Sequence, residues 1–362
     1  MDERPHIFDL DRNGLQAIVE SHGLKRYVAD QVLEWVYRHG VLDVEGMTNI
    51  SASNQALLSE SIIFSRGAVI EDQLASDGTR KVLLDWDTTT GGLPILQVSS
   101  VDRRTEAVMI PTESRRTACV SSQIGCPVGC TFCASGIGGL DGNLSTGQIV
   151  EQIHHLATGD HGGRITNVVF MGMGEPLANM NAVMGAIRTM NADWGFGIGA
   201  RRITVSTVGL PAAIRRFVEF EIPVTLALSL HAPEDDLRRE LIPWAEYSSI
   251  EELLDAASEW FHATGREITL EYILLGGLND RPGHARQLAR LAMQMRANVN
   301  LIRYNEVEGM PHARPRDEDV RQFQRILRAE GVNSHIRASR GRDISAACGQ
   351  LRHESRPSDD QS

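Results

Sequence analysis

The chain of 362 residues carries a formal net charge of -11, and 42% of its residues are hydrophobic. Its mean hydropathy of -0.20 is ordinary for a globular protein that is long enough to form one large domain and a smaller one. No apolar run approaches the ~20 residues that span a bilayer, and residues 1–5 lack the apolar stretch of a secretory signal, so we expect a cytoplasmic protein without a membrane segment.

The first 60 residues follow a helical pattern. Apolar side chains recur at three- and four-residue steps, and Gly23 and Gly40 interrupt them. Residues 62–110 differ, because β-branched runs at 82–84 and 96–98 alternate with turn-forming stretches. The sequence therefore predicts a helical accessory domain over residues 1–60 and a β-rich connector over residues 61–111.

From about residue 115 onward, apolar strands alternate with amphipathic helices. Such alternation predicts parallel βαβ units, and six units are fewer than a closed eight-stranded barrel needs. We predict an α/β fold with a partial (β/α)6 barrel over residues 112–350 and a polar, disordered tail over residues 351–362; a doubly wound sheet would give a similar pattern. The expected strands are 117–121, 167–171, 202–206, 224–230, 268–275 and 299–304, and the expected helices lie near 146–157, 180–190, 211–220, 250–263 and 283–295.

Small or polar residues follow nearly every expected strand. Active sites of (β/α) barrels lie at the carboxyl ends of the strands, so a polar cofactor across the barrel mouth would meet these residues. Each has an ordinary structural explanation, such as a turn, a cap or a satisfied core histidine, but their coincidence on one face favours a site. They are Cys126, Cys130 and Cys133 after the first strand, residues 171–176 after the second, Ser206 and Thr207 after the third, residues 229–231 after the fourth and Asn305 after the sixth.

Three of the five cysteines form a Cx3Cx2C motif, at Cys126, Cys130 and Cys133. In a chain without a secretory signal, cysteines favour metal binding or catalysis over a disulfide framework. Three thiolates can hold three irons of a [4Fe–4S] cluster, and the fourth iron is then open, which is typical of a catalytic rather than a structural metal site. The alternative is a zinc ion with a distant fourth ligand such as Cys119 or His154.

These features resemble the radical SAM superfamily. In that superfamily the open iron binds the amino and carboxylate groups of S-adenosylmethionine (SAM), and one-electron reduction releases a 5′-deoxyadenosyl radical. Further blocks, which extend the likeness over residues 10–351, resemble the RlmN/Cfr RNA methyltransferases. The blocks are CVSSQIGC at 119–126, MGMGEPL at 171–177, SLH at 229–231, NLIRYN at 300–305 and DISAACGQL at 343–351.

The resemblance implies two cofactors, a [4Fe–4S] cluster and SAM, with two SAM molecules used per turnover. Cys126, Cys130 and Cys133 would be the cluster ligands, and Gly174 and Glu175 would contact the SAM amino group. The rest of the SAM pocket would be formed by Ser206, Ser229, Leu230, His231 and Asn305.

The same resemblance assigns three catalytic side chains. Cys348 would accept a methyl group and carry it, because a ring carbon of adenine is not nucleophilic and direct polar transfer from SAM would be very slow. A carbon radical on that S-methyl group would add to the base, and Glu106 would remove the ring proton. Cys119 would then attack the Cys348 sulfur, in chemistry that leaves a disulfide bond between the two residues.

The substrate follows from the family as well. We expect a methyl group at C2 of an adenosine in 23S rRNA, with tRNA as a second candidate substrate. We also expect a flavodoxin or ferredoxin as electron donor and a monomeric enzyme whose residues 1–60 bind RNA. The alternatives are a Cfr-like C8 methyltransferase, toward which residues 300–305 lean, and a non-catalytic RNA-binding protein with a zinc-stabilised loop. The net charge argues against non-specific coating of nucleic acid, but it does not exclude a local basic face, since residues 336–353 hold four arginines against one aspartate. The stretch PWAEYS at 243–248 departs from the family pattern.

Overall fold

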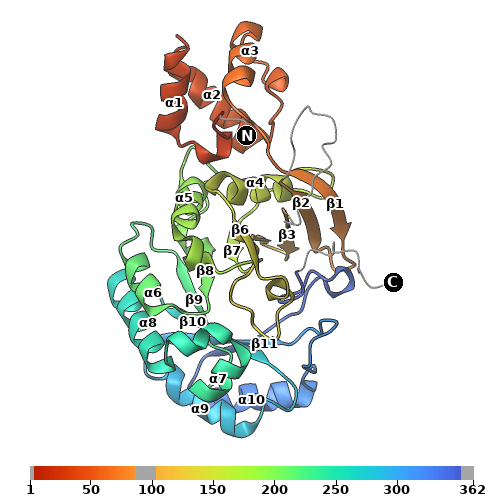
Figure 1. The fold of residues 1–362 in the computed structure, drawn as a ribbon, viewed down its shortest axis with the longest axis vertical. Helices are drawn as coiled ribbons and strands as arrows, with labels where there is room; N and C mark the ends of the chain where they lie inside the picture. The colour runs from red at the N-terminus through yellow and green to blue at the C-terminus, as the bar shows by residue number, and fades with distance from the viewer. Residues whose placement is uncertain (1–3, 87–102, 352–362) are drawn as a thin grey trace, which may run out of the picture.

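The computed structural model describes residues 4–86 and 103–351 (Figure 1). The strand expected at 96–98 and the tail expected beyond residue 351 lie outside the described residues. Within the described ranges, no helix combines the length and the apolar character that crossing a bilayer requires.

Ten strands form one curved sheet in the order β1-β2-β3-β4-β7-β8-β9-β10-β11-β12. Neighbours are antiparallel from β1 to β4 and parallel from β4 to β12. Because β1 and β12 are the two ends of this order, the barrel is open. The strands are β1 (Ala68–Leu74), β2 (Arg80–Asp85), β3 (Arg104–Pro111), β4 (Arg116–Cys119), β7 (Asn167–Phe170), β8 (Ile203–Thr207), β9 (Thr225–Ser229), β10 (Ile268–Leu274), β11 (Ala297–Arg303) and β12 (Ser334–Arg337).

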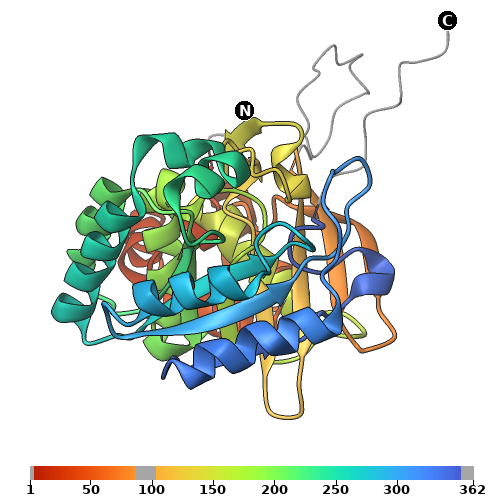
Figure 2. The same ribbon diagram turned by 90° about the horizontal axis from the view of Figure 1, so that it is seen from below.

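Amphipathic helices connect the parallel strands and cover the outer face of the sheet (Figures 1 and 2). Capping boxes start two of them, with Ser145 and Gln148 at α4 and with Ser249 and Glu252 at α8. The expected (β/α) alternation is confirmed. The helices are α4 (Thr146–Ala157), α5 (Met180–Asn191), α6 (Pro211–Val218), α7 (Asp235–Leu241), α8 (Ile250–Thr264), α9 (Pro282–Ala292) and α10 (Asp317–Ala329).

The sheet contains more than the six barrel strands that the sequence predicts. β12 adds a seventh parallel strand, after the unpredicted helix α10, and β1, β2 and β3 continue the same sheet on the other side. A separate antiparallel pair, β5 (Gln123–Gly125) and β6 (Leu140–Asn143), lies beside the barrel. These elements are short or rich in charged residues, so their apolar periodicity is weak.

Three N-terminal helices, α1 (Arg12–Ser21), α2 (Tyr27–Glu34) and α3 (Ala52–Ser61), lie at one end of the molecule beyond α4 (Figure 1). Their apolar side chains belong to the same core as those of the sheet. The Phe8 ring lies 5.6 Å from the ring of His154 on α4, and the Tyr37 ring lies 5.2 Å from that of Phe196. The N-terminal helices therefore have a packed, apolar contact with the barrel.

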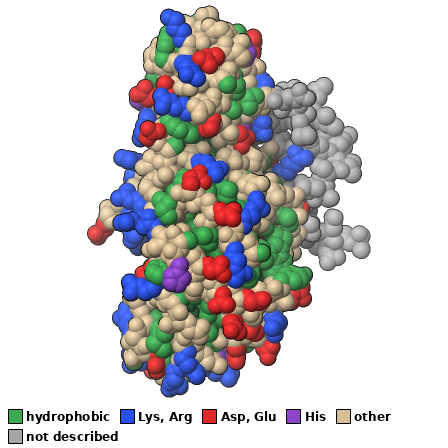
Figure 3. Space-filling model, turned by 90° about the vertical axis from the view of Figure 1, so that its left-hand side faces the viewer, with side chains coloured by type: hydrophobic (Ala, Val, Ile, Leu, Met, Phe, Trp, Pro, Cys, Tyr) green, Lys and Arg blue, Asp and Glu red, His purple; other side chains and the backbone are tan. Residues whose placement is uncertain are grey.

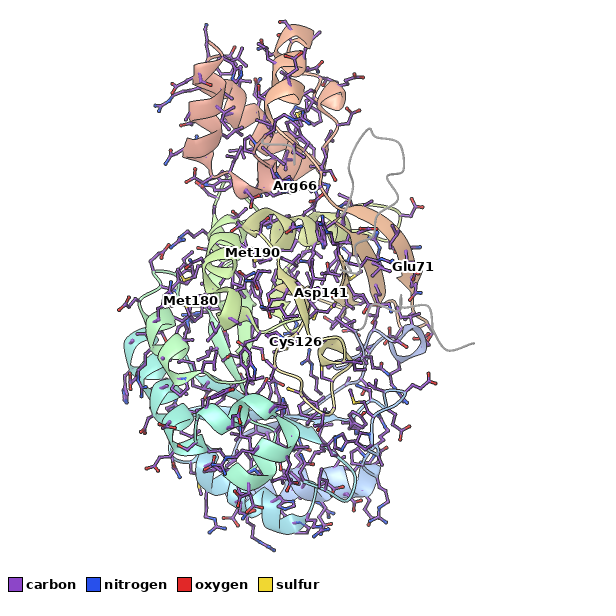
Figure 4. All side chains as sticks on the ribbon, viewed as in Figure 1. Arg66, Glu71, Cys126, Asp141, Met180 and Met190 are labelled. Atoms are coloured by element: carbon purple, nitrogen blue, oxygen red, sulfur yellow. The ribbon has the colours of Figure 1, made fainter. Side chains whose placement is uncertain are left out.

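A buried carboxylate on α4 connects the barrel, through hydrogen bonds, to the segment that follows α3. The Glu151 side chain is 0% exposed and accepts hydrogen bonds from Ser65 Oγ (2.6 Å) and from the backbone N–H groups of Arg66 (3.0 Å) and Gly67 (3.1 Å). The imidazoles of His6 (3.3 Å) and His155 (3.4 Å) flank it. Figure 4 shows Arg66 at this junction. Burial alone would raise the pKa of Glu151, but the hydrogen bonds from His155 and Ser65 and the charge of His6 lower it.

We predict that Glu151→Ala lowers the free energy of unfolding by about 3 kcal/mol at pH 7, because it removes a buried charge and leaves several polar groups without an acceptor. The Glu151 pKa is lowered in the folded state, so its contribution is present above the unfolded-state pKa and is lost as the pH falls through the folded-state pKa. Urea denaturation measures both effects. Glu251→Ala, on the exposed face of α8, is the matched control, and equal stabilities of wild type and Glu151→Ala at pH 7 would contradict the assignment.

Candidate active site

A cavity of about 840 Å3, open solvent at its mouth included, lies at the carboxyl ends of the parallel strands. This is where (β/α) folds place their sites. The residues predicted from the sequence that line it are Cys126, Cys130, Cys133, Gly174, Glu175, Ser206, Ser229, His231 and Cys348. Leu230, Asn305, Cys119 and Glu106 are buried close to this region but do not line the cavity.

The loop that carries the three cysteines begins where β5 ends. Gly125, at φ 74°, has no room for a Cβ against the carbonyl of Gly139, and the Cys126 N–H donates to that same carbonyl at 2.8 Å. Figure 4 shows Cys126 within the curve of the sheet, near Asp141 of β6. The close approach of two backbone segments therefore fixes the start of the loop and requires glycine there.

The thiols of this loop suit an iron–sulfur cluster. Burial raises the pKa of all three, that of Cys126 to about 12, so each stays neutral unless a metal replaces its proton. Three thiols that face one cavity are the donor set that iron–sulfur clusters use. Over residues 4–86 and 103–351, no group of three or more His, Cys, Asp or Glu side chains is arranged as a preformed site for a metal ion.

Gly174 and Glu175 follow β7 and are held by β5. A Cβ on Gly174, at φ +98°, would lie 2.6 Å from Gln123 Cβ, and Gln123 Oε1 accepts from the Glu175 N–H at 2.8 Å. The Glu175 carboxylate accepts from the N–H groups of Leu177 (3.0 Å) and Val208 (2.9 Å). Burial raises its pKa, and a buried carboxylate with free lone pairs is suited to a ligand ammonium group.

Ser206, Ser229 and His231 form the adjoining wall. The two serine hydroxyls lie 3.2 Å apart at the ends of β8 and β9. His231 has φ 60°, rare for a residue other than glycine, and its Nδ1 accepts from the Ile273 N–H at 3.0 Å, so Nε2 carries the proton. Burial and the charge of Arg238 lower the His231 pKa to about 3, so this wall of the cavity is uncharged at neutral pH.

Two charged residues that line the cavity were not predicted. Glu271 on β10 accepts from Asn300 Nδ2 at 3.0 Å, and its Oε2 lies 4.0 Å from Arg337 Nη1 on β12. Arg337 also donates to Met171 Sδ at 3.3 Å. A charge within the apolar strand around Glu271 was a visible signal in the sequence, whereas the position of Arg337 depends on β12.

The arginines of residues 336–353 have different surroundings in the structure. Arg337 faces the cavity, and Arg340 lies 3.9 Å from Asp77. Asp343 accepts from the Ser76 N–H at 2.8 Å. The segment is docked on the turn between β1 and β2, since its polar groups find partners there, and Arg352 lies outside the described residues.

Cys119 and Cys348 approach one another from different parts of the chain. Cys119 is the last residue of β4 and is 5% exposed. Burial, and to a smaller extent the nearby Cys348, raises the pKa of its thiol to about 12, and the charge of Arg337 opposes this rise. Cys348 lies in the loop after β12, and its carbonyl accepts from Asn305 Nδ2 at 3.4 Å. All five cysteines are free thiols, so the disulfide implied by the resemblance is not formed in this structure.

Glu106 lies on β3, on the same face as Cys119. Val108 pairs with Cys119 across β3 and β4, and side chains two residues apart on a strand share a face. The Glu106 carboxylate is buried and lies 2.7 Å from the Lys81 ammonium group of β2. The Glu106 carboxylate therefore lies beside the Lys81 cation, on the face of the sheet that carries Cys119.

Comparisons with known proteins agree with this architecture. Residues 120–289 match the model of the radical SAM superfamily, and residues 6–63 match that of the ribosomal RNA large subunit methyltransferase N-terminal domain. A probable dual-specificity RNA methyltransferase RlmN from Gloeobacter violaceus is 43% identical, over 94% of this chain and 93% of the relative. The dual-specificity RNA methyltransferase RlmN of Halorhodospira halophila is 40% identical, over 95% of this chain and 92% of the relative.

A solved structure is similar over almost the whole chain. The crystal structure of a radical SAM methyltransferase from Sphaerobacter thermophilus superimposes with a TM-score of 0.87 at 37% identity and covers 96% of this chain and 99% of that one. The enzymes of this superfamily use a [4Fe–4S] cluster and SAM. The chain belongs to the RlmN family of radical SAM RNA methyltransferases.

Proposed function

We propose that this enzyme methylates C2 of an adenosine in 23S rRNA, and an adenosine in tRNA as well, through an S-methylcysteine on Cys348. The observation that carries the proposal is one cavity lined by the three-cysteine loop, by the Gly174–Glu175 segment and by Cys348. The dual specificity follows that of the curated RlmN relatives. We further propose a flavodoxin or ferredoxin as electron donor and a monomeric enzyme in the cytoplasm.

In this proposal Cys126, Cys130 and Cys133 hold the cluster, and Glu175, next to Gly174, accepts hydrogen bonds from the SAM amino group. Burial of Glu175 strengthens that contact because few water molecules compete for it. The cluster and SAM, when bound, supply a carbon radical and, from a second SAM, the methyl group. The remaining SAM contacts are assigned to Ser206, Ser229 and His231, which line the cavity. Leu230 and Asn305 are assigned to the same pocket, although both are buried and do not line the cavity.

Cys348 carries the methyl carbon to the base, and Glu106 takes the ring proton. The adduct must also lose one electron, which the oxidised cluster, when bound, would accept. The Lys81 ammonium group lies 2.7 Å from the Glu106 carboxylate. The Cys119 thiolate then attacks the Cys348 sulfur. An S–S bond forms, the S–C bond breaks, and the carbon left on the base takes a proton and becomes the methyl group. The nearby charge of Arg337 favours the Cys119 thiolate that this step requires.

Recognition of RNA is assigned to residues 1–60, which match the N-terminal domain of ribosomal RNA methyltransferases. Contacts with phosphates dominate such binding and make it depend on salt. The face in Figure 3 carries Lys and Arg side chains interspersed with Asp and Glu, with more of the basic ones toward one edge. A mixed surface of this kind suits recognition of a folded RNA by shape and unstacked bases, rather than general coating of the backbone.

The two cysteines of the transfer step should have separable roles. Cys348→Ala should abolish methylation and still hold a full cluster, because the carrier sulfur is lost. Cys119→Ala should retain a cluster and accumulate a covalent adduct between protein and RNA, because the bridging carbon forms and is not released. Denaturing gel electrophoresis with labelled RNA measures the adduct. Free methylated RNA from Cys119→Ala at the wild-type rate would contradict the proposed order.

The position of the methyl group is tested by the product. Incubation with 23S rRNA and with tRNA, nucleoside digestion and mass spectrometry against standards should give 2-methyladenosine from both RNAs. The base must be unstacked and turned toward Cys348 for either carbon to react, so C2 and C8 differ only in its orientation. 8-Methyladenosine as the product would contradict the C2 assignment and favour the Cfr-like activity.

A further inference from the structure

Arg238 on α7 is an arginine buried beside the active site. It is 1% exposed, and its Nε donates to the carbonyl of Leu230 at 3.2 Å while Nη2 donates to that of Val208. Its Nη1 is also buried and, within the part of the chain that the structure describes, has no hydrogen-bond partner. An unsatisfied buried donor on a charged group is costly, so the geometry calls for an acceptor at this place.

No carboxylate of the described residues satisfies this need. The charge of Asp235, the acidic neighbour on α7, acts on Arg238, but Asp235 Oδ1 accepts from the Ile250 N–H at 2.8 Å. Burial lowers the pKa of Arg238 to about 10, so the guanidinium remains protonated at neutral pH. A buried positive charge thus stands at the barrel mouth with one free donor.

The cysteine loop lies against the same helix. The Thr131 N–H donates to the carbonyl of Leu241, at the end of α7, at 3.0 Å. Cys130 is the residue just before Thr131, and its thiol and the Arg238 guanidinium are close enough to interact electrostatically. The unsatisfied Nη1 donor and the Cys130 thiol therefore belong to the same region of the barrel mouth.

We propose that Arg238 is a positioning residue for the iron–sulfur cluster. Its Nη1 donates a hydrogen bond to sulfur at Cys130, and its positive charge stabilises the reduced state of the cluster. The inference rests on the proposed role of Cys130 as a cluster ligand. Reduction adds one electron from a low-potential donor, forms and breaks no bond, and makes the cluster more negative. Hydrogen bonds to the sulfurs and the local charge are among the factors that set such potentials, so the effect of Arg238 is to raise the reduction potential.

The same guanidinium connects the cluster to the proposed SAM pocket. The carbonyl of Val208 accepts from Arg238 and its N–H donates to Glu175 Oε2 at 2.9 Å. The carbonyl of Leu230 lies between Ser229 and His231, which line the cavity. One side chain thus holds the loops after β8 and β9 at a fixed place relative to Cys130.

The test is an anaerobic redox titration of the reconstituted, full-length enzyme, followed by electron paramagnetic resonance. Arg238→Gln keeps a donor for one carbonyl and removes the charge. At a fixed potential its ratio of reduced to oxidised cluster should fall about tenfold, which is 59 mV for one electron. Arg238→Lys keeps the charge and should stay near wild type. The matched control is Arg239→Gln, because Arg239 is half-exposed and pairs with Asp236 at 2.8 Å; it should titrate as wild type.

A wild-type potential in Arg238→Gln with a complete cluster would overturn the inference, and so would an equal fall in Arg238→Gln and Arg238→Lys, which would show a role in packing alone. If Arg238→Gln assembles no cluster, Arg238→Lys decides: a potential near wild type supports the inference, and a tenfold lower ratio contradicts it. Failure of the wild-type chain to bind a cluster would contradict the proposed function itself, so the two failures are distinguishable.

Discussion

The site depends on how the cysteine loop is held. Loop backbone groups bond to three other segments: Cys126 to Gly139 after the loop, Thr131 to Leu241 of α7, and Ala134 to Gly349 beside Cys348. Backbone groups that are buried must be paired, so each bond fixes a piece of the chain relative to the thiols. The segment that carries Cys348 and the helix that carries Arg238 are thereby placed next to the proposed cluster ligands.

Buried polar and charged groups continue this arrangement across the barrel mouth. Glu175 holds the Val208 N–H, Glu271 pairs with Asn300 and approaches Arg337, and Lys81 contacts Glu106. In a low-dielectric interior such groups are stabilising only when they are partnered. These polar groups lie at the mouth of the barrel, whereas the outer face of the sheet packs on an apolar core, and this contrast places the proposed chemistry at one end of the fold.

The periodicity of the sequence predicts most of the barrel. The predicted bounds of α4 agree with the observed bounds at both ends. The predicted bounds of the five strands β7, β8, β9, β10 and β11 lie within one or two residues of the observed ones. Buried apolar runs and caps define these elements in the sequence. Helix α10 was missed because charged residues dominate it, although Val320, Phe323 and Leu327 are buried at helical spacing. β12 is only four residues long, and missing it made Arg337 look like a surface arginine. The roles of Arg238 and Lys81 depend on contacts between distant segments, which no local pattern encodes.

The proposed chemistry requires an iron–sulfur cluster held by Cys126, Cys130 and Cys133 with one iron open to SAM. Anaerobic reconstitution, iron and sulfide analysis, and electron paramagnetic resonance of the reduced protein with and without SAM test it most directly. We expect about four irons and four sulfides per chain and a signal that changes when SAM is added. We also expect loss of the cluster in Cys130→Ala but not in Cys119→Ala. A full, SAM-responsive cluster in Cys130→Ala, or zinc in place of iron in the wild type, would contradict it.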